Sequence, residues 1–305
     1  MNRVCRPRGV GATQITSLAF AGILLAFPHL SFGTPILLST VSGFAMLGAA
    51  AVTNTGPTTL GGNLGVSNNS SITGITGFYG TLANDGPGTF TGSAHQGDAF
   101  AILADSQLVS AMTTLSLMGP GTTLTLADLT GLSLTPGVYT VPAGVSNLTG
   151  ALVLDGGGDA NAQWVFLMGS TFITSPNSSV SVINVGSGAG VGLYWNVGTS
   201  ATLDTNTTFA GNILASASIT MNNGVTVSCG RALVHTGAVT LINDHISIGC
   251  EGSGYALSGG FNGGSAIGTE LAPVPEPASL VLLGSGLALA VGLKRRHSRS
   301  LAPKR

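Results

Sequence analysis

Apolar and polar residues alternate in short segments that repeat along the second half of the chain. Three of these segments, at 201–203, 219–221 and 239–241, place one threonine between two apolar residues. Successive side chains of a β-strand point to opposite faces, so the apolar residues predict an inward face and the threonines an outward one. A longer match, of 169–180 with 198–209, extends the repeat toward the N-terminus. A period near 20 residues with short strands in each copy predicts a stacked β-helix.

The alignment of the copies predicts two outward columns of hydroxyl side chains. The first column comprises Thr202, Thr220 and Thr240, and the second comprises Ser179, Thr208, Thr226 and Ser247. Ile173 takes the next position of the first column and interrupts it. Residues 53–55 form a third candidate patch, although their composition is equally typical of a turn. Asparagines between the strand pieces of each copy predict turns, because asparagine tolerates left-handed backbone.

One stretch, residues 94–118, has apolar residues at helical spacing, with Gly119-Pro120 as its stop. We therefore expect a single helix of five or six turns in an otherwise mainly β chain. Its expected apolar positions are Ala99, Phe100, Ile102, Leu103, Leu108, Ala111, Met112 and Leu115. An antiparallel β-sandwich is the alternative fold, since it tolerates irregular strand spacing better than a stack does.

The N-terminus has the pattern of a secretory signal peptide over residues 1–33. Three arginines precede an apolar run at 15–30, and Ser31 and Gly33 offer small residues before a cleavage site. We therefore expect an exported protein whose mature domain spans 34–252. A Gly/Ser-rich linker is expected over 253–273.

The C-terminal residues 274–305 contain Pro275, Glu276 and Pro277, a hydrophobic segment at 278–293 and a basic tail. This order resembles the C-terminal sorting signal of exported proteins in exopolysaccharide-producing Gram-negative bacteria. The resemblance implies a membrane-embedded sorting protease as partner and release to the cell surface or matrix. A plain membrane anchor is the alternative, and both interpretations allow transient anchoring in the inner membrane through 278–293.

The distribution of charge and the cysteines limit the classes of function that the domain can have. Between residues 34 and 274, Arg231 is the one Lys or Arg residue and there are ten acidic residues, so the domain is unsuited to binding nucleic acid. Cys229 and Cys250 are the two cysteines outside the signal peptide, and in an oxidising compartment such a pair is expected to form a disulfide. A metal site is the rival interpretation, but two cysteines without CxxC spacing support it poorly.

The sequence offers little that is typical of an enzyme. Three histidines remain between the two terminal signals, and neither a Ser/His/Asp set nor an HExxH motif is present. Asp155, Asp159 and Asp204 form the best carboxylate candidates, yet residues 155–159 are more typical of a Gly/Asp turn. We expect no catalysis and no cofactor.

Many short motifs, in order, resemble the microbial ice-binding protein family. They are found at 44–48, 52–58, 62–66, 134–139, 148–155, 161–166, 192–198, 209–215 and 230–233. The resemblance covers roughly 37–248 and implies a discontinuous right-handed β-helix (a solenoid) of triangular section with one long α-helix alongside. It also implies that N-terminal residues form turns late in the stack.

The resemblance implies that the protein adsorbs to ice or ordered water through a flat Thr/Ser-rich face and restrains ice growth or recrystallisation. Other members of the family are surface or adhesin-like proteins. The alternative function is therefore a structural or adhesive protein of the cell surface, in contact with extracellular polysaccharide. Threonine suits an ordered face because its β-branched side chain is stiff at χ1.

Overall fold

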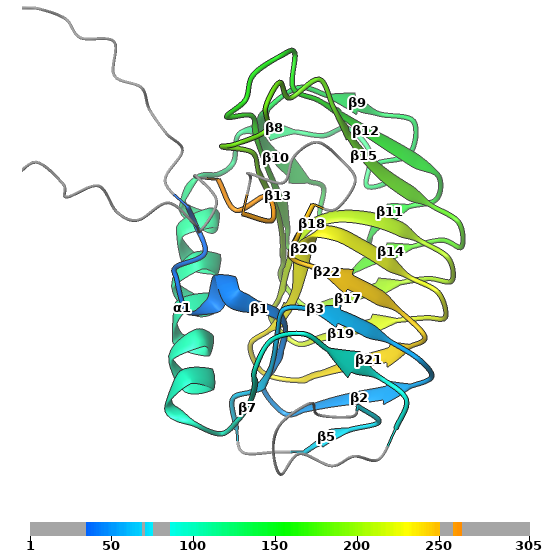
Figure 1. Ribbon diagram of the computed structural model, residues 1–305. Coiled ribbons are helices and arrows are strands. Elements are labelled where there is room, and N and C mark those ends of the chain that lie inside the picture. Colours follow the sequence, from blue (N-terminus) through cyan, green and yellow to red (C-terminus); the bar gives the residue numbers. More distant parts are fainter. Residues whose placement is uncertain (1–34, 69–70, 76–85, 251–258, 264–305) are drawn as a thin grey trace, which may run out of the picture. The chain divides into compact units, whose positions relative to one another are not determined.

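The computed structural model describes residues 35–68, 71–75, 86–250 and 259–263. The chain divides into two compact units after Ser31, and all of the described residues lie in the second unit. The expected signal peptide at 1–33, the Pro275–Pro277 motif and the hydrophobic segment 278–293 lie outside the described residues. The described part is mainly β, with two sheets of parallel strands and one α-helix, α1 (Figure 1).

Seven strands form the smaller sheet, which we call the seven-strand row. In order they are β11 (Ser146–Leu148), β14 (Phe172–Thr174), β17 (Ser200–Leu203), β19 (Ser218–Met221), β21 (Ala238–Ile242), β2 (Ala51–Thr55) and β5 (Ile72–Thr73). Every pairing between them is parallel. A parallel stack with one strand per copy is the arrangement that the repeat predicts, and it excludes the antiparallel β-sandwich.

The fifteen-stranded sheet contains two further rows, joined where β18 and β20 bend. The helix-covered row is β8 (Thr122–Thr123), β10 (Gly137–Val141), β13 (Gln163–Met168), β16 (Gly192–Val197), β18 (Thr208–Ala215), β20 (Thr226–Val234), β1 (Phe44–Gly48), β4 (Asn63–Val66) and β7 (Ala94–Gln96). The third row is β9 (Ser133–Leu134), β12 (Ala151–Asp155), β15 (Ser179–Ile183), the first halves of β18 and β20, β22 (His245–Ser247), β3 (Thr59–Gly61) and β6 (Thr89–Phe90). At the bend the register between β18 and β20 shifts, and Gly211 and Cys229 adopt positive φ.

Chain order and stacking order differ. The N-terminal strands β1, β2 and β3 pair with β20, β21 and β22, which come near the end of the domain. Strands from the two ends of the domain therefore lie side by side, as the family resemblance implied.

The core lies between the rows and is filled by aliphatic and aromatic side chains that stack from one turn to the next. Phe166 and Trp195 stack with ring centroids 4.2 Å apart, and Phe172 continues the series. Both tryptophans are fully buried, and the Nε1 of Trp164 and of Trp195 each donates to a backbone carbonyl. These rings therefore belong to the core and not to a binding surface.

Helix α1 (Ala99–Leu117) confirms the expected single helix but begins later than predicted. Residues 94–96 form β7, and Asp98 caps the helix by accepting a hydrogen bond from the Ala101 backbone N–H at 2.8 Å. Of the expected apolar positions, Leu108, Ala111 and Leu115 are buried, as are Ala101 and Ala104, whereas Phe100, Ile102 and Leu103 are exposed. Apolar residues occur on every side of this helix, so their spacing alone does not show which side is buried.

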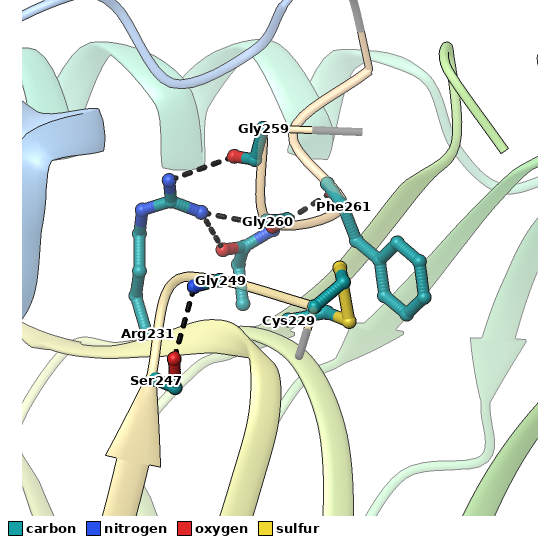
Figure 2. Close-up of a disulfide and its surroundings, with 9 residues drawn as sticks. Cys229, Arg231, Ser247, Gly249, Gly259, Gly260 and Phe261 are labelled. Carbon is teal, nitrogen blue, oxygen red and sulfur yellow. Dashed lines mark hydrogen bonds between the residues drawn. A yellow bond between two sulfur atoms is a disulfide. The ribbon is translucent and has the colours of Figure 1, made fainter. Parts of the chain in front are cut away.

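Residues 259–263 are not linker, which corrects the expectation for 253–273. Phe261 is buried, its backbone carbonyl accepts from the Leu193 N–H, and Asn262 hydrogen-bonds both the N–H and the carbonyl of Leu37. Arg231 donates to the Gly259 and Gly260 carbonyls, beside the disulfide that joins Cys229 and Cys250 (Figure 2). The expected disulfide is thus present, and a short segment beyond it belongs to the domain.

Candidate functional site

The first predicted column lies on the outer surface of the seven-strand row. Thr202 pairs with Thr220 and Thr220 with Thr240, in direct register across three strands. All three side chains are partly exposed, whereas their apolar neighbours along each strand are fully buried. The predicted alternation of inward apolar residues and outward threonine is therefore observed.

Two N-terminal strands lengthen this column. Thr53 of β2 pairs with Thr240, and Thr73 of β5 pairs with Thr53. Five threonines in consecutive register thus form what we call the threonine column: Thr202, Thr220, Thr240, Thr53 and Thr73. With strands about 4.8 Å apart, it spans roughly 19 Å.

The sequence pattern did not place Thr53 and Thr73 in this column. Residues 53–55 were a separate patch in that interpretation, because the N-terminal strands are far from β21 in sequence. A usable signal was present, since residues 52–53 repeat the order of an apolar residue followed by threonine. Of the patch, Thr53 and Thr55 are exposed, whereas Asn54 is buried and donates to the carbonyls of Gly56 and Gly74.

Small polar residues flank the threonine column on one side, and one charged residue flanks it on the other. Ser200 and Ser218 lie two residues before Thr202 and Thr220, and their hydroxyls are hydrogen-bonded at 2.9 Å. Asp204 follows Thr202 by two residues and accepts from the Asn222 side chain at 2.8 Å. Hydrogen bonds from Asn222 and from the Thr205 N–H lower the pKa of Asp204, so this carboxylate is charged at neutral pH.

The second predicted column lies on the third row and is partly confirmed. Ser179 pairs with Thr208 and Thr208 with Thr226, as expected. The prediction for Ser247 is wrong: His245 pairs with Thr226, and Ser247 is buried, where its hydroxyl accepts from the Gly249 N–H. The predicted column places Ser247 next to Thr226, which is two residues out of register, because His245 takes that position and Ile246 pairs with Val227.

Beyond His245 the second column continues with Thr59 and Thr89. The His245 ring is hydrogen-bonded to the Thr59 hydroxyl through Nδ1. An imidazole therefore interrupts the run of hydroxyl side chains near its middle. The third row offers a less uniform surface than the seven-strand row does.

Asparagines stack at the corner between the seven-strand and third rows. Asn177, Asn206 and Asn243 all adopt left-handed backbone, with φ of 60°, 57° and 55°. The turns also bond to one another, since the Asn177 N–H donates to the Thr205 carbonyl and the Asn206 N–H to the Asn223 carbonyl. These repeated turns keep consecutive strands in register, which in turn aligns the threonines.

Within the described ranges, no group of three or more His, Cys, Asp or Glu residues could hold a metal ion. The three aspartates considered above are separated: Asp155 bonds the Gly157 N–H and the Asn184 side chain, Asp159 bonds the Asn161 N–H, and Asp204 bonds Asn222. Each is thus engaged locally in a turn. What the arrangement offers is a regular surface of methyl and hydroxyl groups.

Comparison with known proteins agrees with this architecture. The family model described as ice-binding-like matches residues 46–247, and the PEP-CTERM protein-sorting motif matches 273–296. A protein of Nostoc sp. (strain HG1) called an ice-binding protein is 40% identical over 264 residues, which cover 86% of this chain and 88% of that protein.

Solved structures show the same fold. The crystal structure of an ice-binding protein from the Antarctic ascomycete Antarctomyces psychrotrophicus aligns with a TM-score of 0.62 and 32% identity, over 70% of this chain and 98% of that one. A domain of Shewanella frigidimarina ice-binding protein 1 aligns with a TM-score of 0.60 and 26% identity, over 70% of this chain and 97% of that one. This chain belongs to the ice-binding-like family, which is not a family of enzymes.

Proposed function

We propose that the protein is exported and adsorbs to ice through the outer surface of the seven-strand row, which restrains the growth or recrystallisation of ice. The threonine column carries this proposal. Its methyl and hydroxyl groups repeat at the strand spacing and lie on a stiff parallel sheet. Such a surface can hold water in a regular arrangement without losing much side-chain entropy.

The seven-strand row suits this role better than the third row does. Its five consecutive threonines carry no titratable group, whereas the third row has His245 in the corresponding column and a buried Ser247. Thr202, Thr220 and Thr240 are therefore the proposed contact residues, together with Thr53 and Thr73. Thr208, Thr226 and Ser179 would form an accessory surface at most.

A matched pair of variants tests the assignment. Thr220 and Thr226 are both partly exposed and lie near the middle of their columns. Thr220→Lys places a hydrated charge on the threonine column and should abolish thermal hysteresis and recrystallisation inhibition, whereas Thr226→Lys should retain both. Circular dichroism melts of the two variants serve as the folding control.

The converse result, with activity lost only in Thr226→Lys, would move the working surface to the third row. Full activity in both variants would refute adsorption through either column. If the unaltered protein itself shows no recrystallisation inhibition, the proposed function is wrong.

Two finer structural features belong to the same proposal. The three rows support a solenoid of triangular section, and right-handed connections are the rule between parallel strands. The match to the sorting motif supports display at the cell surface, after transient anchoring through 278–293 and processing by a membrane-embedded protease.

The sorting motif also favours a second candidate function, that of a structural or adhesive protein in a polysaccharide matrix. Deleting 275–305 should then release the protein from the cell surface into the medium. Unchanged surface retention after that deletion would exclude this route of attachment.

A further inference from the structure

The outer side of α1 is apolar. Ile102, Leu103 and Leu117 are 52%, 48% and 81% exposed, and Val109 is also exposed. At 100° per residue these four side chains fall on the side of the helix opposite Leu108 and the other buried positions. The inner side packs on the helix-covered row, so the outer side has no partner within the described residues.

Four of the five hydroxyl side chains of α1 donate to carbonyls of the helix itself. The side chains of Ser106, Thr113 and Thr114 donate to the carbonyls four residues earlier, at 3.1, 2.9 and 2.9 Å, and Ser116 does the same at 2.8 Å. A hydroxyl bonded in this way needs no water for its proton and costs less to place in an apolar medium. The outer side is thus less polar than its Ser and Thr content indicates.

Charge is almost absent from the helix. Asp105 is its one charged residue, and it lies beside His235, whose Nδ1 is 3.1 Å away. Mean hydropathy reaches 1.3, so by length and composition the helix could cross a membrane. Because Ala104, Leu108 and Ala111 are packed on the sheet, a crossing is excluded, and only lateral contact with a membrane is possible.

The last described residues, 259–263, lie on the side of the domain that carries α1. The side chain of Asn262 meets the Tyr194 hydroxyl and both backbone groups of Leu37, and these two residues pack in the apolar cluster beneath α1. Fourteen residues, 264–277, separate Gly263 from the hydrophobic segment 278–293. Extended, they reach roughly 46 Å, against a helix of about 28 Å.

We propose that the outer side of α1 rests on the lipid bilayer while 278–293 holds the protein at the membrane. The seven-strand row lies at the opposite edge of the domain from α1 (Figure 1), so the threonine column then points away from the membrane. The inference rests on the proposed anchoring. An aliphatic and hydroxyl surface without cations fits uncharged lipid, so the contact is insensitive to salt.

Lipid-quenching measurements on the full chain test this orientation. In a Cys5→Ser background, Ser106→Cys places a fluorophore on the outer side of α1, and Asn223→Cys places one on the exposed corner as the matched control. The protein is incorporated into phosphatidylcholine nanodiscs with and without brominated acyl chains. We expect quenching at position 106 to exceed that at 223 severalfold, and Ile102→Ser with Leu117→Ser to halve it at unchanged incorporation.

Equal quenching at both positions, or none at 106, would overturn the proposal. Cross-linking of two copies through position 106 would assign the surface to a second copy of the chain. Protection of position 106 in detergent as well would assign it to the chain's own 278–293 segment. If the protein does not enter the nanodisc, the anchoring itself is refuted, whereas the proposal that the protein adsorbs to ice still stands.

Discussion

Replacement of Arg231 tests how the two ends of the domain are joined. Its guanidinium donates from Nε to the Ser42 carbonyl at 2.8 Å, and from Nη1 and Nη2 to Gly260 and Gly259, each at 2.9 Å. A fourth bond, of 2.7 Å, reaches the Asn212 side chain. From one buried position, the residue thus connects the N-terminal part of the domain at Ser42, β18 and the segment 259–263.

The magnitude follows from these four acceptors. Burial lowers the pKa of Arg231 to about 10, which still leaves the side chain charged at neutral pH. Arg231→Met keeps the apolar stem but removes the donor from three buried oxygens and from the part-buried Gly259 carbonyl, at a cost of about 1 kcal/mol each. Relief of the desolvated charge offsets part of this, so the free energy of unfolding should fall by about 3 kcal/mol.

Urea denaturation of the purified protein measures this change, and thermal melts should shift by roughly 10 °C. Hydrogen exchange of the peptide containing Phe261 adds a local measurement, because 259–263 should lose protection before the core does. Arg231→Lys keeps the charge but not the planar guanidinium group, so its free energy of unfolding should lie between those of the unaltered protein and Arg231→Met. A loss below 1 kcal/mol with unchanged protection would refute this account of Arg231.

Three further outcomes follow from buried or edge groups. Burial raises the pKa of Asp244 to about 7, so the folded protein keeps a proton that the unfolded chain releases near pH 4. Stability should therefore fall as pH rises from about 4 to about 7 and level off above that, and Asp244→Asn should flatten this slope in denaturation curves. Asp204→Asn removes the charge beside the threonine column and should lower the concentration needed for recrystallisation inhibition; weaker inhibition would contradict the proposed surface. Replacing Cys229 and Cys250 by serine should cost about 3 kcal/mol by the loop-closure estimate, and a calorimetric melt would show whether it does.

Local pattern was enough to predict the repeated strands in the second half of the chain. The inward and outward residues of 201–203, 219–221 and 239–241 alternate as expected, because the side-chain period of a strand is fixed by its geometry. The same holds for the asparagine turns, since few residues other than glycine accept positive φ. The disulfide followed from a pair of cysteines in an exported domain.

The local sequence pattern did not predict which strands pair when they are far apart in the sequence. Nothing local places Thr53 next to Thr240, which is why the threonine column was predicted with three members instead of five. The prediction for Ser247 is wrong for a related reason. A shift of two residues keeps the alternation of inward and outward positions, so only strand pairing shows that 244–246, and not 246–248, aligns with 225–227. The linker prediction failed at Phe261, where one buried ring and the Asn262 amide outweigh a Gly/Ser-rich composition.

The N-terminal strands β2 and β5 lie at the end of the seven-strand row, after β21, and this position links the stability of the domain to its proposed function. Thr53 and Thr73 belong to the threonine column only while the N-terminal strands remain seated on β21, and Arg231 holds that end of the chain through the Ser42 carbonyl. Weakening Arg231 should therefore shorten the ordered column before it unfolds the domain. In that case Arg231→Met would lose ice activity at temperatures where its far-ultraviolet circular dichroism is still native, whereas Thr226→Lys would not.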